Sequence, residues 1–198
     1  MKGEILLDRD IHLKDLQHEL EWPSAAKEHL LLLEFSKFLR TYLQSKEHLM
    51  QGHISDAYDN VLEALQHWAK IVIIEAGFNP KTTVWNQLKS INPGVYKLFE
   101  ELTSSHETLT QRVQLVLLAS EFSVMNKMQR CCQMLLRVLS GRDVAWSLPE
   151  LQQNHLLSGV SVELPMLLEW LVKKSLAKEI IYTIDEQMNE LEIRYTGV

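Results

Sequence analysis

The chain has 198 residues, of which 46% are hydrophobic and 23% charged, and its formal net charge is −6. This length fits one ordinary domain, or one domain with a small appendage, and supplies enough apolar residues for a sizeable core. The acidic balance excludes a globally basic nucleic-acid-binding protein, and the apolar runs are far too short for a membrane span.

The first 22 residues predict the end of a strand followed by a linker. Residues 4–7, EILL, form a short apolar run, and the acidic cluster DRD follows at 8–10. The next stretch is helical in pattern and offers this strand no partner, which indicates more sheet upstream in the natural protein. A frayed end or the first turn of a helix is the alternative interpretation.

Residues 23–145 predict an up-down bundle of four or five helices with short links. Apolar residues recur at intervals of three and four, and Gly, Pro, Asn, Ser and Thr mark the ends. The predicted helices run from Ser24 to about Met50, from His53 or Ser55 to about Ala76, from Thr82 or Thr83 to Leu88, over 93–102, and from Ser104 or Ser105 to Leu139.

Residues 146–198 predict a small winged-helix-like module. Two short helices are expected at Leu148–Leu157 and Val162–Ser175, separated by Gly159. Two alternating runs rich in Ile, Tyr and Thr, at 179–184 and 190–196, then predict a β-hairpin. The alternative is that 176–189 continues the preceding helix. The predicted fold class is therefore mainly α, a helical bundle followed by a small module with a C-terminal hairpin.

The two cysteines, Cys131 and Cys132, are adjacent in an apolar helical run. Neighbouring residues of a helix point about 100° apart, so these thiols are expected to be reduced and buried. Together with a start, MKGEILLDRD, that does not read as a signal peptide, this favours a cytoplasmic protein.

One polar stripe is the candidate substrate-binding surface. Asp56, Asn60, Glu63, His67 and Lys70 step by three and four along the second predicted helix, beside its apolar stripe. Such a stripe is either a solvated face or the wall of a groove that meets a substrate, and the sequence leaves both open.

Histidine spacing predicts no metal site. His12 and His18 are six residues apart, and His48 and His53 lie on either side of a helix end. Neither pair has the i, i+4 spacing with a third ligand that a helical zinc site shows.

Four stretches together carry a family resemblance: GEILLDRD at 3–10, GHISDAYDNVLEALQHWAKIVIIEAGFNP at 52–80, VWNQLKSINPGVYKLFEELT at 84–103 and LLASEFSVMNKMQRCC at 117–132. In this order they resemble the bacterial nucleotidyltransferase-like proteins of the polymerase-beta type. The resemblance implies a helical substrate-binding-like bundle and a winged helix that follow a catalytic domain.

In that family a Gly-Ser pair and a D-x-D pair hold two Mg²⁺ ions and a nucleoside triphosphate. This chain has no Gly-Ser pair, and its single D-x-D, Asp8 and Asp10, resembles the end of the last strand of the catalytic sheet. These two carboxylates are the metal candidates, but a solvated turn is the favoured interpretation. The resemblance thus implies a non-catalytic chain whose partners are an N-terminal catalytic domain and a hydroxyl-bearing acceptor.

Three functional hypotheses follow. The first is the substrate-binding or regulatory part of a nucleotidyltransferase-like protein. The second is an interaction or dimerisation scaffold without nucleotidyl transfer, using the edge of the hairpin. The third, a DNA-binding regulator, is disfavoured because residues 161–198 carry four Lys or Arg against seven Asp or Glu, which would repel phosphate.

Overall fold

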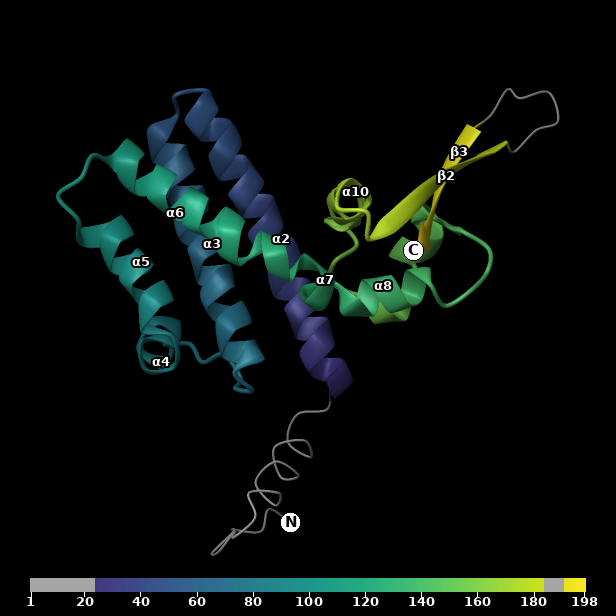
Figure 1. Cartoon of the computed structure of the whole chain (residues 1–198), viewed down its shortest axis with the longest axis horizontal. Coiled ribbons are helices and arrows are strands. Elements are labelled where there is room, and N and C mark those ends of the chain that lie inside the picture. Colours follow the sequence, from purple (N-terminus) through teal and green to yellow (C-terminus); the bar gives the residue numbers. More distant parts are fainter. Residues whose placement is uncertain (1–23, 184–190) are drawn as a thin grey trace, which may run out of the picture.

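The computed structural model describes residues 24–183 and 191–198 (Figure 1). The predicted strand at 4–7 and the metal candidates Asp8 and Asp10 lie outside the described residues. The first half of the described chain is helical, as predicted, with five helices listed in chain order: α2 (Ser24–Met50), α3 (Ile54–Glu75), α4 (Val84–Ile91), α5 (Pro93–Ser104) and α6 (Leu109–Ser123).

Helices α2 and α3 form a long hairpin at the centre of the molecule (Figure 1). The turn between them depends on Gly52, whose φ of 79° suits a residue without a Cβ. Ser45 ties the two helices together by donating to the carbonyl of Ala57 at 2.7 Å. The apolar stripes of both helices are buried between them and supply much of the core, including Leu32, Phe35, Phe38, Leu39, Val61, Leu65, Ile71 and Ile74.

Helices α4 and α5 are two short helices that contact each other and pack beside α3. Asn92 caps α5 by accepting from the backbone N–H of Val95 at 3.1 Å, and Pro93 occupies the first turn, where its missing N–H costs nothing. The rings of Trp85 and Phe99 stack with their centroids 4.0 Å apart and join the two helices.

The single helix predicted up to Leu139 is wrong. Thr108, not Ser104 or Ser105, begins it through a capping box with Gln111. After α6 the chain passes through η1 (Met125–Lys127) and then through two short helices, α7 (Met128–Cys131) and α8 (Gln133–Leu139). Val124, Met125 and Met128 stay buried in the core through this break, and the break directs α8 against α2.

The C-terminal part contains a three-stranded antiparallel sheet in the order β1-β3-β2. The elements of this C-terminal part, in chain order, are β1 (Trp146–Ser147), α9 (Leu148–Gln152), η2 (His155–Leu157), α10 (Leu164–Lys173), β2 (Ala177–Thr183) and β3 (Leu191–Gly197). The predicted pairing of the two alternating runs is confirmed, with Ile181 opposite Ile193. The sequence did not predict β1, which consists of two residues and pairs with β3.

The mainly helical fold class with a small C-terminal antiparallel sheet is confirmed. Cys131 and Cys132 are buried and unbridged, as expected. None of the helices in the described part of the chain combines the length and apolar content needed to cross a bilayer. The division into segments 1–22, 23–145 and 146–198 stays a prediction.

Candidate functional site

A buried acid lies between α2 and α3 and binds two members of the predicted polar stripe. Glu34 of α2 is 8% exposed, and its Oε2 accepts from Nδ1 of His67 at 2.5 Å. Its other oxygen accepts from Nζ of Lys70 at 3.3 Å. Burial raises the pKa of Glu34, but the hydrogen bond and charge of His67, together with Lys70, outweigh it and leave that pKa below its usual range.

These contacts continue toward solvent and toward the C-terminal part. Nε2 of His67 lies 3.6 Å from Glu63, and Nη2 of Arg40 lies 3.8 Å from the same carboxylate. Arg40 also places its Nε 3.5 Å from Oε1 of Glu163, just before α10. We call this set the ionic chain: Lys70, Glu34, His67, Glu63, Arg40 and Glu163. Carboxylates alternate in it with Lys, His and Arg side chains, and these contacts join α2, α3 and the residue before α10.

The structure therefore divides the predicted stripe. Glu63, His67 and Lys70 come together in the ionic chain. Asn60 donates to the backbone carbonyl of Asp56 at 2.8 Å, within its own helix. Asp56 is exposed in the first turn of α3, at the other end of the stripe.

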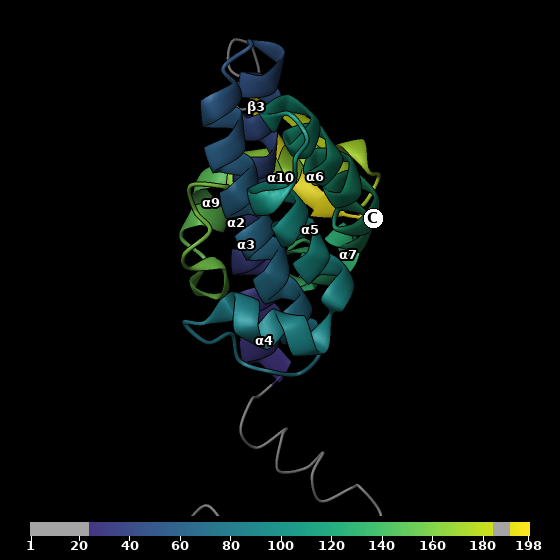
Figure 2. The same ribbon diagram turned by 90° about the vertical axis from the view of Figure 1, so that its left-hand side faces the viewer.

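A hollow of about 470 Å³ lies on a different face of α3, between α3, α5, α6 and η1. In Figure 1, α6 runs across α3 with α5 beside them, and Figure 2 shows α9 on the opposite side of the α2–α3 pair from α5 and α6. This volume is within the range of small-molecule sites, about 300–1,000 Å³. The lining residues are Trp68, Val72, Asn92, Gly94, Val95, Leu98, Ala119, Ser123 and Lys127.

The hollow combines an apolar floor with one cationic side chain, Lys127. Trp68, Val72 and Val95 are almost fully buried and form its floor. Lys127 donates to Oε2 of Glu75 at 2.5 Å, and Nη1 of Arg130 lies 3.8 Å from the other oxygen of that carboxylate. Of these two cations only Lys127 lines the hollow, and it is paired with Glu75. The sequence analysis missed the hollow, because its lining comes from three helices and a turn that are separated along the chain.

The two carboxylates beside His67 do not have the arrangement of a Mg²⁺–nucleotide centre. Such a centre needs two carboxylates that face the same ion. Glu34 and Glu63 instead lie on either side of His67, each paired with a second cation.

Residues 28–127, about half of the chain, match the YgxA-like substrate binding domain. The chain is also 36% identical over 177 residues to YgxA, an uncharacterized protein of Bacillus subtilis (strain 168). That match covers 89% of this chain and 60% of the relative, so this chain spans about three fifths of the relative's length.

A solved structure shows the same arrangement over nearly the whole chain. The crystal structure of a nucleotidyltransferase-like protein from Exiguobacterium sibiricum 255-15 superposes with a TM-score of 0.84 at 30% sequence identity. The superposition covers 99% of this chain and 68% of that protein. This likeness supports the nucleotidyltransferase-like interpretation of the sequence.

Proposed function

This chain belongs to the family of the YgxA-like substrate binding domain, and from that premise we propose that it is the substrate-binding part of a nucleotidyltransferase-like protein. We place the substrate in the hollow between α3, α5 and α6. One observation carries this placement: every residue that lines the hollow, from Trp68 to Lys127, lies within the matched stretch 28–127.

The polar stripe from Asp56 to Lys70 is the other candidate surface, and the contacts favour the hollow over it. The side chains of the ionic chain are already paired with one another, and one member, Glu163, lies outside the matched stretch. A substrate there would have to displace several ion pairs, whereas the hollow has a mainly apolar lining with one paired cation, Lys127.

The composition of the hollow indicates the chemistry of its ligand. The half-buried Leu98 side chain offers apolar surface, and Lys127 favours a phosphate or another anionic group. Under the nucleotidyltransferase interpretation the ligand carries the acceptor hydroxyl. A catalytic domain would supply Mg²⁺ and the nucleoside triphosphate, and holding the acceptor in place would provide much of the rate enhancement.

The proposal is tested by ligand binding to the full chain. Melting temperature and calorimetric heat are measured with Mg²⁺-ATP, with aminoglycosides and with other polyols, since a ligand of the folded state raises the melting temperature. A binder should lose affinity in Gly94→Leu and Ser123→Leu, which fill the hollow. A Cβ at Gly94 lies 3.4 Å from Oδ1 of Asn92, an ordinary contact, so this variant should fold.

The matched control is Gln114→Leu, an exposed position on α6 outside the hollow. This variant should bind like the unmodified chain. No binding by any compound, or equal binding by all three variants, contradicts the placement in the hollow.

For the C-terminal part we propose a winged-helix-like module that docks protein, a second copy of this chain included, rather than DNA. The strand order β1-β3-β2, with α9 and α10 between β1 and β2, supports the winged-helix interpretation. Ile181, Leu191 and Ile193 are at least half exposed on the hairpin, which favours an apolar partner. Salt-dependent binding of short DNA duplexes would contradict this part of the proposal.

A further inference from the structure

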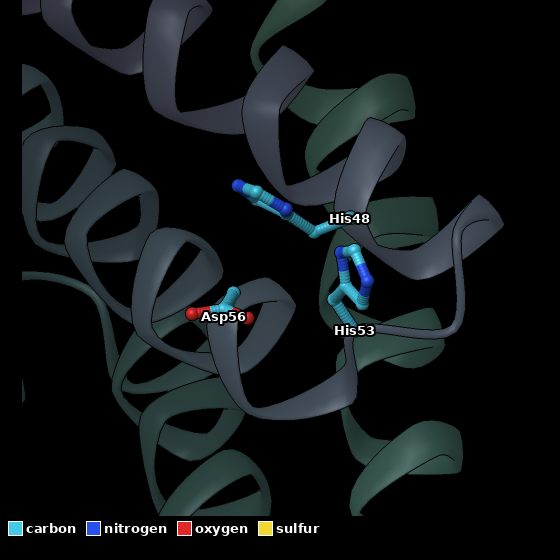
Figure 3. A group of neighbouring side chains, drawn as sticks. All are labelled: His48, His53 and Asp56. Carbon is cyan, nitrogen blue, oxygen red and sulfur yellow. The ribbon is translucent and has the colours of Figure 1, made fainter.

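The junction of α2 and α3 brings together the side chains of two histidines and a carboxylate. His48 lies near the end of α2, His53 directly precedes α3, and Asp56 lies in the first turn of α3. One donor atom from each side chain lies within 4.8 Å of those of the other two. Figure 3 shows the His48 ring reaching from α2 toward the start of α3, where His53 and Asp56 stand.

The backbone holds this group in place. The N–H of His53 donates to the carbonyl of His48 at 2.9 Å, and the N–H of Ala57 donates to the carbonyl of His53 at 2.9 Å. Gly52, with its positive φ, allows the tight turn that makes the first of these bonds. The three side chains are thus attached to a hydrogen-bonded turn rather than to a loose loop. The backbone therefore needs little further ordering to gather them around an ion.

The donor atoms match a particular class of ion. Two imidazole nitrogens and one carboxylate oxygen suit Zn²⁺ and its neighbours among the transition metals, whereas Mg²⁺ and Ca²⁺ prefer oxygen donors alone. Donor atoms around a tetrahedral zinc ion are about 3.3 Å apart at its usual bond lengths. Small rotations of the exposed His53 and Asp56 side chains can close the group to that separation.

A second observation points to a ligand. Among the described residues, Nδ1 of His48 is one of the few buried side-chain polar atoms without a hydrogen-bond partner. A buried nitrogen without a partner is destabilising, and native structures usually give such an atom a bond. An ion bound at this junction through Nδ1 of His48 would remove part of that cost.

We propose that His48, His53 and Asp56 form a three-ligand site for Zn²⁺ or a similar divalent transition metal, with the remaining coordination positions open to solvent. Because the site lies at the end of the α2–α3 hairpin and shares no residue with the hollow, the proposal stands or fails independently of the substrate-binding role.

The test uses the full chain without an affinity tag, titrated with Zn²⁺ alone in a calorimeter and with Co²⁺ alone in a spectrophotometer. One equivalent should bind, and Co²⁺ should give the visible absorption of a low-coordinate nitrogen–oxygen site. His53→Gln and Asp56→Asn should each weaken Zn²⁺ binding by more than about ten-fold, since even indirect partners of a metal contribute ten- to hundred-fold.

The control is His155→Gln, which removes an exposed histidine in η2. It should bind like the unmodified chain. The two ligand variants should remain folded, because both side chains are exposed and His53 makes no side-chain capping bond. Circular dichroism checks this. Absence of one-equivalent binding, or equal affinity in His53→Gln, Asp56→Asn and the control, overturns the site.

Discussion

Replacing Glu34 by Gln should destabilise the fold more than any other single change in the ionic chain. The amide keeps the size of the side chain but removes the charge that His67 and Lys70 share. Removing one partner of a buried ion pair costs about 3–5 kcal/mol. The Lys70 side chain is 24% exposed, so water can replace part of its lost interaction. We therefore expect a cost of about 2–3 kcal/mol.

The assay is urea and thermal unfolding followed by circular dichroism at pH 7. For a chain of this size a loss of 1 kcal/mol lowers the melting temperature by roughly 2–4 °C, so Glu34→Gln should lower it by roughly 4–12 °C. The matched control is Glu63→Gln, the same change at a side chain that is 49% exposed. Surface pairs contribute about 0–1 kcal/mol, so this control should be nearly neutral. Equal effects of the two variants would refute the reasoning.

Three further predictions concern other parts of the protein. The folded-state pKa of Glu34 is lowered, so the contribution of Glu34 to stability is complete above about pH 4.3 and is lost as the pH falls further. Below that pH the unfolding free energy should fall more steeply in the unmodified chain than in Glu34→Gln. Parallel slopes would contradict this prediction. Burial raises the pKa of Cys131 to about 12 and that of Cys132 well above its usual range, so neither thiol should react with a disulfide reagent at pH 8 until the chain unfolds, and rapid modification would show that they are accessible. A Cβ at Gly197 would lie 1.9 Å from Oγ and 3.0 Å from Cβ of Ser140, so Gly197→Ala should cost about 1–3 kcal/mol in urea unfolding, and an unchanged midpoint would show that Ser140 yields freely.

The ends of the helices in the first half were predictable because local residues determine them. Gly52 and Asn92-Pro93 act within one turn of chain, and the observed bounds of α2, α3 and α5 lie within about two residues of the predicted ones. The break after α6 was not predictable in this way. Val124, Met125 and Met128 continue an apolar helical pattern, and only the packing of α8 against α2 requires the turn.

The candidate sites depend on contacts that helical spacing cannot show. The residues of the stripe from Asp56 to Lys70 lie on one helix, α3, as predicted. The sequence did not show that Glu34 of α2 binds two of them, His67 and Lys70. Glu34 carried a signal, since it lies within the apolar run of α2 beside Phe35, where an acid needs a partner.

The histidine group was missed for a different reason. The i, i+4 spacing of a helical zinc site applies to one helix, whereas the turn at Gly52 brings His48 and His53 together from two elements. The hollow likewise needs the folded positions of α5 and α6, which no pattern in the sequence fixes relative to α3.

The central claim, that the bundle holds a substrate between α3, α5 and α6, is tested most directly by amide chemical-shift mapping. The isotope-labelled full chain is titrated with a compound that raises its melting temperature. We predict that the perturbed amides cluster at Trp68, Gly94, Leu98, Ser123 and Lys127, around the hollow. Perturbations centred on Glu63, His67 and Lys70 instead would place the ligand on the polar stripe and contradict the account.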